Sequence, residues 1–263
     1  MYWSIDFNPI DIRTYIPVFI RVIRPISEIR DKIALPNSKE PKRGIAQKDR
    51  NMTKNDSKIW DFDEYDWIEH YDESMRNLKR LHYEETLTRI PELASAKAYE
   101  LVLDIGTGTG NSAVPFLQMG CHVVGVDPSE RMIEYAKKKA EQYKDFFSVL
   151  HVDDPFLNLP FSNDSFDVVV SAYAIHHLPD PDKKTAIKEM KRVLRSNGRM
   201  IIADTMFKDE EHKLLALSNY HDLEDEYQPL LKIFPDMFES ECLDVVMQQI
   251  GELVWIVIAK KRE

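Results

Sequence analysis

The sequence lacks a long hydrophobic run, a secretory leader pattern and a cysteine framework. No uninterrupted apolar stretch approaches the roughly 18 residues that a membrane-spanning helix needs. The first residues contain neither a continuous apolar segment nor a small-residue cleavage site, so no secretory signal is expected. Only two cysteines are present, Cys121 and Cys242, which is too few for a disulfide or metal framework. A reducing cytoplasm is therefore the expected location.

The charge of the chain is negative overall and unevenly distributed. The formal net charge is -10, yet residues 1–56 hold 11 Lys and Arg against 7 Asp and Glu, a balance of +4 that leaves -14 for the rest. An acidic main domain repels a phosphate backbone, so no nucleic-acid partner is expected. Apolar residues make up 43% of the chain, enough to bury a full core.

The first 56 residues differ in pattern from the remainder. Pro17 and Pro25 interrupt any long helix there, and residues 36–57 are polar, charged and turn-prone, as in a linker. We therefore divide the chain into an N-terminal extension with linker, 1–56, and a domain, 57–263. Two interpretations of the extension stay open: either the natural start is Met52, or an accessory arm covers the active site or joins two copies.

From residue 99 onward, short apolar runs alternate with helical patterns. Strands are expected at 100–106, 122–127, 146–153, 166–173 and 199–204, with a turn at Asn197-Gly198 before the last of these. Helices are expected at 111–118, 130–143 and 182–194, and Ser129 is a good N-cap for the second. Such alternation predicts a mainly parallel sheet covered on both faces. The tail predicts two further strands around Gly251-Glu252, a hairpin that adds an antiparallel pair at the sheet edge.

Two other segments read as helical. Residues 60–98 carry leucines and isoleucines at helical spacing, and Pro91 is expected to kink or restart the second piece. Residues 208–234 form a helical insert between the fifth strand and the hairpin. Tyr65, Trp67, Tyr220 and Phe234 from these segments are candidates to line an apolar pocket.

The strongest local signal is LDIGTGTG, residues 103–110. A buried strand ends in an acid, and a glycine-rich turn then leads into a helix N-terminus with free N–H groups. Asp127 follows at the end of the next strand, where a carboxylate can accept both hydroxyls of a ribose. NAD enzymes use an acid in the same place, and a helix-capping role for Asp127 is also open.

The chain resembles the class I S-adenosylmethionine (SAM)-dependent methyltransferases, in particular their small-molecule, type 11 branch. The resemblance covers about residues 60–260. It rests on LDIGTGTG, VVGVDPSERMIEYAKKKA, LPFSNDSFDVVVSAYAIHHLPD and KEMKRVLRSNGRMIIAD, in that order. It implies a Rossmann-like α/β fold with a seven-stranded, mostly parallel sheet of order 3-2-1-4-5-7-6, an antiparallel terminal hairpin, and helices on both faces.

The resemblance also implies SAM as the methyl donor and assigns residues to it. Asp104 would hold the methionine amine, Asp127 the ribose, and Met132 one face of the adenine, although Met132 also fits simple core packing. Asp153 or Asp154 would meet the adenine amino group, and the choice between them is open. The other residues expected at the cofactor are Tyr71, which pairs with Asp72 in a motif of the family, Gly106, Thr107, Gly108, Gly110, Ser171 and Ala172.

The catalytic residues are not assigned by the sequence, and His176 and His177 are weak candidates. Histidine can accept a proton near neutral pH, but methyl transfer from a sulfonium depends mainly on alignment. The family often carries a histidine at this place as part of a structural turn. The adenine-methylating Pro-Pro-Tyr type of element is absent after the fourth strand, where SAYA stands, and so is a Pro-Cys nucleophile. Both absences argue against DNA bases as acceptors.

We therefore expect a methyltransferase acting on a small molecule, as a monomer or homodimer. A SAM-binding regulator or partner subunit without transfer activity shares every cofactor residue and is the first alternative. An NAD(P)-dependent oxidoreductase is the second, but it predicts wider glycine spacing and a catalytic Tyr-Lys pair, neither of which is evident.

Overall fold

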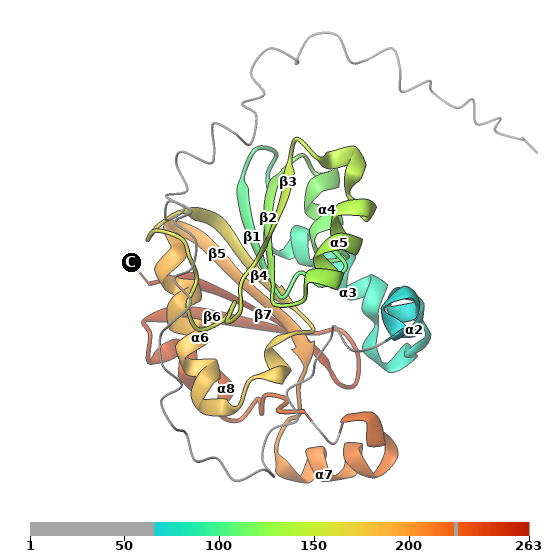
Figure 1. Ribbon diagram of the computed structural model, residues 1–263. Coiled ribbons are helices and arrows are strands. Elements are labelled where there is room, and N and C mark those ends of the chain that lie inside the picture. The colour runs from blue at the N-terminus through green and yellow to red at the C-terminus, as the bar shows by residue number, and fades with distance from the viewer. Residues whose placement is uncertain (1–65, 224–225, 263) are drawn as a thin grey trace, which may run out of the picture.

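A computed structural model describes residues 66–223 and 226–262, which form one sheet with helices packed on both faces (Figure 1). The expected extension 1–56, including both interpretations of Met52, lies outside the described residues.

The sheet has seven strands in the order β3-β2-β1-β4-β5-β7-β6. Strands β1 to β5 pair in parallel, and β7 runs antiparallel to both of its neighbours, β5 and β6. The predicted order and the terminal hairpin are therefore confirmed. The strands are β1 (Leu101–Ile105), β2 (His122–Asp127), β3 (Phe147–His151), β4 (Phe166–Ala172), β5 (Leu194–Thr205), β6 (Leu243–Gln249) and β7 (Val254–Lys261).

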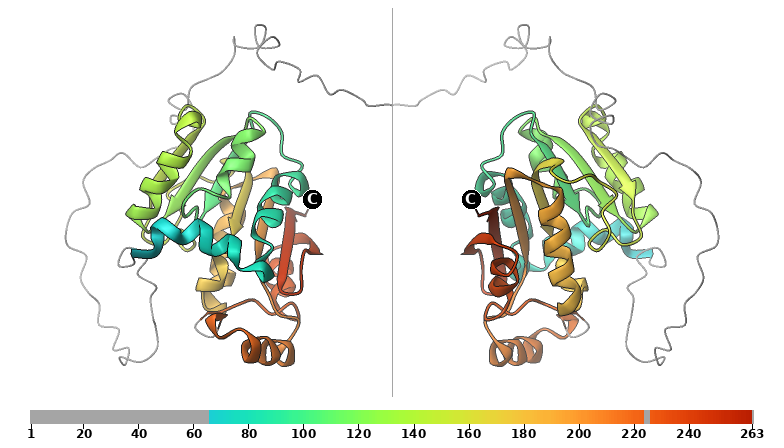
Figure 2. Two further views of the ribbon diagram at one scale, coloured as in Figure 1. Left: turned by 90° about the vertical axis from the view of Figure 1, so that its right-hand side faces the viewer. Right: turned by 90° about the vertical axis from the view of Figure 1, so that its left-hand side faces the viewer.

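Helices cover both faces of the sheet, as the two side views make clear (Figure 2). The α-helices are α2 (Tyr71–Asn77), α3 (Tyr83–Leu93), α4 (Ala113–Gln118), α5 (Glu130–Lys139), α6 (Asp180–Val193), α7 (Glu210–Asn219) and α8 (Phe234–Glu239). Short 3-10 turns are η3 (Asp66–His70), η4 (Lys79–Leu81), η5 (Glu141–Tyr143), η6 (Ile175–His177) and η7 (His221–Leu223).

Each face of the sheet buries its own core. Leu103 and Ile105 of β1 belong to the core under α6 and α8, whereas Val102 belongs to the core under α3, α4 and α5. Both faces are covered, so β1 and β2 are buried along their whole length, which explains why their sequences are mainly apolar. The edge strand β6 alternates instead, and its Val246 is 66% exposed.

Several predicted boundaries shift for identifiable reasons. Helix α4 begins at Ala113 instead of Asn111, because the side chains of Asn111 and Ser112 bond to carboxylates. The expected turn at Asn197-Gly198 is wrong: both residues lie within β5, where the pairing with β4 shifts register and produces a bulge.

The prolines do not break helices where expected. Pro91 lies in the last turn of α3, which ends at Leu93, so no second helix starts at this proline. Helix α6 begins at Asp180, two residues earlier than predicted, because Pro181 fits the first turn, where its missing N–H is not needed. Helix α5 stops at Lys139 instead of reaching Tyr143, and a 3-10 turn follows.

The carboxyl ends of the parallel strands are flanked by the two variable helical segments. Helix α2 precedes the sheet, and α7 belongs to the insert after β5, which packs as a small separate cluster around Phe207, Leu223 and Leu253 (Figures 1 and 2). None of the helices in 66–223 and 226–262 is long and apolar enough to cross a membrane.

Candidate active site

A glycine turn between β1 and α4 forms the floor of the site. Gly106, Gly108 and Gly110 all have positive φ, at 70°, 51° and 83°. A Cβ atom on Gly106 would lie 2.7 Å from the Cβ of Ala174, so this glycine allows the loop after β4 to pack against the turn. A Cβ on Gly108 would meet nothing within 4 Å among the described residues. Within this part of the chain, the backbone at Gly108 leaves room for another group to approach it closely.

Asp104, at the carboxyl end of β1, is fully buried beneath this turn. Its Oδ2 accepts hydrogen bonds from the hydroxyls of Thr107 and Ser112, each at 2.7 Å. Its Oδ1 is also buried and has no hydrogen-bond partner among the described residues. Burial, followed by the nearby carboxylate of Asp127, raises the pKa of Asp104 to about 6. An unsatisfied buried carboxylate oxygen is unfavourable unless a donor group meets it.

Asp127, at the end of β2, holds the turn from the other side. Its Oδ2 accepts from the N–H of Gly108 at 2.8 Å, and its Oδ1 accepts from the N–H of Ser129 at 2.9 Å. Ser129 caps α5 as predicted, accepting from the N–H of Met132. Asp127 therefore supports the turn at Ser129 that caps α5, which was one of the two roles considered for it. The ribose role of Asp127 stays a prediction.

Helix α2 is anchored to the glycine turn through Asp72. Its Oδ1 accepts from the hydroxyl of Thr109 at 2.6 Å and from the amide of Asn111 at 2.7 Å, and its Oδ2 pairs with Lys139 of α5. Partial burial opposes ionisation, but the hydrogen bonds from Lys139, Thr109 and Asn111 lower the pKa of Asp72 below its usual value. The network ties three elements together at one point, and so it positions the neighbouring Tyr71.

Several acidic groups of the site act on the hydroxyl of Tyr71. Burial, then Tyr83, Asp127, Asp72 and Asp204, raise the pKa of its hydroxyl well above the ordinary value. Asp127 ends β2 and Asp204 lies in β5, so the charges that act on this hydroxyl come from both halves of the sheet edge.

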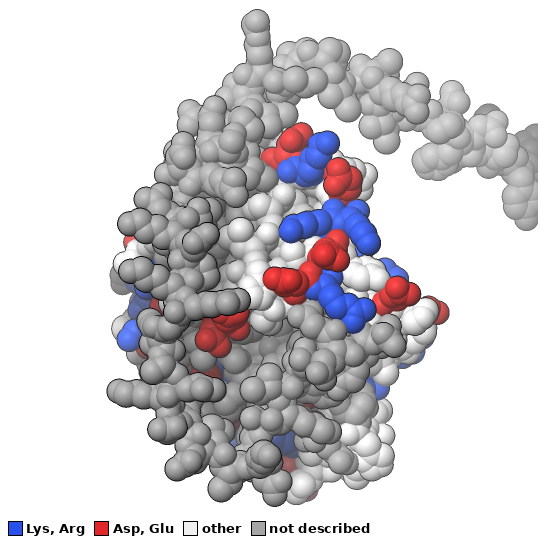
Figure 3. Space-filling model, viewed as in Figure 1, with Lys and Arg blue, Asp and Glu red and all other residues white. Residues whose placement is uncertain are grey.

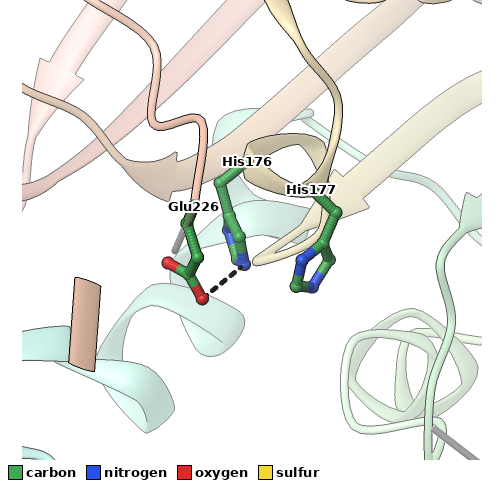
Figure 4. Close-up of side chains that lie close together, drawn as sticks. All are labelled: His176, His177 and Glu226. Atoms are coloured by element: carbon green, nitrogen blue, oxygen red, sulfur yellow. Dashed lines mark ion pairs between the residues drawn. The ribbon is translucent and has the colours of Figure 1, made fainter. Parts of the chain in front are cut away.

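Beyond Tyr71, four ionisable side chains gather over the ends of β4 and β5. The Nδ1 of His176 lies 2.6 Å from Oδ1 of the fully buried Asp204, and its Nε2 lies 3.5 Å from Oε1 of Glu226 (Figure 4). The His177 ring lies beside it, with ring centroids 4.1 Å apart. Burial disfavours the imidazolium, but the two carboxylates outweigh it and raise the pKa of His176 to about 9. Burial and the charge of His176 lower the pKa of His177 well below its usual value.

Glu226 reaches this cluster because the insert after β5 folds back onto η6. The N–H of Tyr227 donates to the carbonyl of His176 at 2.8 Å, which fixes the backbone next to Glu226. The buried amide of Gln228 donates to Oε2 of Glu226 at 2.9 Å. The other oxygen, Oε1, is thereby directed at His176.

The remaining predicted cofactor residues surround the turn. Met132 is buried but belongs to none of the hydrophobic clusters that form the cores. Asp153 and Asp154 are both exposed after β3, and the Asp153 side chain, 92% exposed, lies 3.9 Å from His151. At the end of β4, the hydroxyl of Ser171 is buried without a hydrogen-bond partner among the described residues, and Ala172 is half-buried.

The aromatic residues expected to line an acceptor pocket lie in different parts of the structure. Phe234 is wrong as a lining residue: it is 1% exposed and stacks edge-on against Phe238 in the core under α6 and α8. Tyr220 packs in the insert, with the guanidinium of Arg80 over its ring at 4.9 Å. Tyr65 and the side chain of Trp67 lie outside the described residues.

Sequence reasoning missed Asp204, Glu226 and Lys139 as parts of this site. Asp204 had a readable signal, since an acid near the carboxyl end of a buried parallel strand occupies the same kind of position as Asp104 and Asp127. Glu226 and Lys139 had none, because each reaches the site only through folding of the insert or the packing of α5.

Fold and site together define a Rossmann-like α/β protein with two buried acids beneath a glycine turn. Residues 102–198 match the family model described as a methyltransferase domain. An uncharacterized methyltransferase of Oceanobacillus iheyensis is 35% identical over 213 residues, covering 74% of this chain and 94% of the relative. Another, of Bacillus pumilus, is 34% identical over 209 residues, covering 75% and 95%.

Solved structures share the fold. The YcgJ protein of Bacillus subtilis superimposes with a TM-score of 0.57 at 22% identity, covering 69% of this chain and 99% of that one. Magnesium protoporphyrin IX methyltransferase of Synechocystis, solved with bound S-adenosylhomocysteine (SAH), gives 0.59 at 19% identity, with 73% and 94% covered. The chain belongs to the class I SAM-dependent methyltransferases, and SAM is its methyl donor.

Proposed function

We propose that this methyltransferase transfers the methyl group of SAM to a small-molecule acceptor, and that the donor binds over the glycine turn between β1 and α4. The observation that carries the donor site is the buried Oδ1 of Asp104, which has no hydrogen-bond partner among the described residues. It lies beneath a turn where a Cβ on Gly108 would meet none of the described residues within 4 Å. A cationic amine close to this oxygen would satisfy it.

The other donor contacts follow from the placement of the predicted residues. Asp127 accepts the N–H groups of Gly108 and Ser129, which holds its carboxylate beside the turn where we place the ribose. Met132 is buried outside the hydrophobic clusters, which favours the adenine role over simple core packing. The residues proposed to complete the donor site are Tyr71, Gly106, Thr107, Gly108, Gly110, Ser171, Ala172 and either Asp153 or Asp154.

When bound, SAM supplies a methyl group on a positively charged sulfur. The contribution of the chain is to hold donor and acceptor in line and to limit the access of water, since such a displacement depends mainly on proximity and alignment. Tyr71 is suited to this because the Asp72 network fixes α2 against the turn. We place the acceptor on the side of Asp204 and His176, next to Tyr71.

A small acceptor suits the carboxyl end of the sheet better than a macromolecule does. The α2–α3 segment and the insert meet there, with Arg80 packed on Tyr220. In Figure 3, positive and negative side chains are interspersed over the described part of the face in view, without a broad basic patch of the kind that tracks a phosphate backbone. We also propose a cytoplasmic location and a monomeric or homodimeric state, the first because Cys121 and Cys242 are both free thiols.

A thermal-shift titration with SAH, run beside NADH, tests the donor site. At 100 times its dissociation constant, SAH should stabilise the domain by about 2.7 kcal/mol, a rise in Tm of several degrees. Asp104→Asn is a clean variant, because the amide oxygen can keep both bonds to Oδ2 while an N–H₂ group replaces Oδ1. It should abolish the shift, and the exposed Asp145→Asn should retain it. A shift with NADH alone, or an unchanged response in Asp104→Asn, would contradict this donor site.

The acceptor class is tested by release of SAH. The full chain is incubated with SAM and panels of small thiols, amines and phenols, beside tRNA and denatured protein. Turnover with a small-molecule panel, lost in Asp104→Asn and retained in Asp145→Asn, is the expected result. Turnover confined to tRNA or protein would refute the small-molecule proposal while leaving the donor site intact.

A further inference from the structure

Three side chains over the ends of β4 and β5 have the composition and spacing of a metal site. His176, His177 and Glu226 each offer one ligand atom, and these atoms all lie within 4.8 Å of one another. Figure 4 shows the three side chains next to one another, with His176 between Glu226 and His177. Metal–ligand bonds of about 2.0–2.2 Å put neighbouring ligand atoms roughly 3–3.5 Å apart, so small side-chain rotations would suffice.

The residues behind these ligands hold them in orientation. Asp204 bonds the Nδ1 of His176, which leaves Nε2 to face Glu226. A carboxylate behind a histidine in this manner fixes the ring and its tautomer, as it does in protein metal centres. On the other side, Gln228 bonds Oε2 of Glu226 and so directs Oε1 inward.

The charge at this point also suits a cation. Asp204 is fully buried, and the side chain of Glu226 is only 16% exposed, so two carboxylates are brought together with little water to screen them. A protonated His176 between them would balance only one of these two negative charges. A divalent ion would balance both, and it would bind His177 as well.

We propose that His176, His177 and Glu226 bind one divalent transition-metal ion of the zinc type, with Asp204 and Gln228 as positioning residues. Two imidazoles and one carboxylate favour zinc, cobalt or nickel over magnesium or calcium, which prefer oxygen ligands alone. Three protein ligands leave at least one coordination position open.

The open position would receive the methyl acceptor. An acceptor thiol or hydroxyl that coordinates the ion would release its proton to solvent more readily than the free acceptor does. The resulting bound anion would be a stronger nucleophile than the protonated acceptor. This role rests on the proposed transfer to a small molecule, whereas metal binding itself does not.

The test is a titration of the full, tag-free and chelator-treated chain with Co²⁺, followed by visible absorption, and with Zn²⁺, followed by calorimetry. We expect one ion to bind per chain. We also expect the bound Co²⁺ to show the intense visible absorption bands that are typical of a low coordination number. Glu226→Gln and His177→Ala should each weaken binding at least 10- to 100-fold, and Gln228→Ala about 10-fold. The exposed control variants His70→Ala and Glu239→Gln should bind as the unchanged chain does.

SAH affinity, measured on the same samples, separates this proposal from the donor site. Unchanged SAH binding with lost metal binding in Glu226→Gln would support the metal site. Failure of the unchanged chain to bind stoichiometric Co²⁺ or Zn²⁺ overturns it, as does binding that Glu226→Gln and His177→Ala leave intact. If the unchanged chain does not bind SAH, that result would instead contradict the proposed donor site.

Discussion

Replacing Gly108 with alanine separates ligand approach from fold stability in this protein. Gly108 has φ of 51°, and its missing Cβ would meet no described atom within 4 Å. Alanine at positive φ costs about 1–2 kcal/mol, and no steric clash adds to this. In a domain of this size that lowers Tm by about 2–8 °C, taking roughly 2–4 °C per kcal/mol.

The effect on the donor should be much larger than the effect on the fold. The new methyl group would occupy space in which we place SAM, and overlap of this kind costs about 1–3 kcal/mol. Since each 1.4 kcal/mol is tenfold in affinity, SAH should bind about 5- to 150-fold more weakly. Calorimetric titration of SAH and a thermal melt of the same sample measure both effects.

Gly120→Ala is the matched control. Gly120 has φ of 80°, and its added Cβ would lie at an ordinary 3.4 Å from Ala98, far from the site. It should lower Tm by a similar amount and leave SAH affinity unchanged. Equal SAH affinity in the two variants would refute the reasoning that the donor approaches Gly108. If Gly108→Ala does not fold, Gly108→Asn tests the same point, because asparagine tolerates this conformation better.

Three further predictions concern named groups. SAH affinity should fall by up to tenfold per pH unit below about pH 6, because the pKa of Asp104 is about 6 and only its ionised form attracts the amine. Isothermal titration calorimetry of Asp104→Asn should find no such dependence on pH. For the ligand-free protein the sign is opposite, since a raised carboxyl pKa means that stability decreases as pH rises from about 4 to 6. Asp72→Asn should lower the free energy of unfolding by about 1–3 kcal/mol and weaken SAH binding, because the Lys139 pair that helps fix α2 is lost; urea unfolding measures the first effect. Arg199→Lys should cost about 1–3 kcal/mol in the same assay with SAH affinity unchanged, because lysine cannot reproduce the two-point bond to Glu100 at 2.7 and 2.9 Å.

The order of strands could be predicted from the sequence because each piece of evidence was local or matched a known pattern. Short, mainly apolar runs such as that of β1 indicate strands buried on both faces, and alternation with helices implies parallel pairing. Ser129 was identified as a cap from its place before a helical pattern, and the cap is present. The Asn197-Gly198 turn was wrong because its residue types favour turns, whereas the segment is an irregular part of β5, at the register shift between the pairings of Leu194 and Arg199 with β4.

The candidate site divides in the same way. Asp104, Asp127 and the glycine turn were identified from one continuous motif and its spacing, since the carboxyl ends of neighbouring parallel strands must meet at one edge of a sheet. The approach of Glu226 to His176 was not predictable, because it depends on how the insert folds back through the bond between Tyr227 and His176. The class of enzyme and the residues proposed for the donor could be identified from the sequence alone, because they lie close together along the chain. The cluster of His176, Asp204 and Glu226, where we propose that the acceptor binds, depends on the fold, because these residues come from three separate segments whose proximity is set by packing.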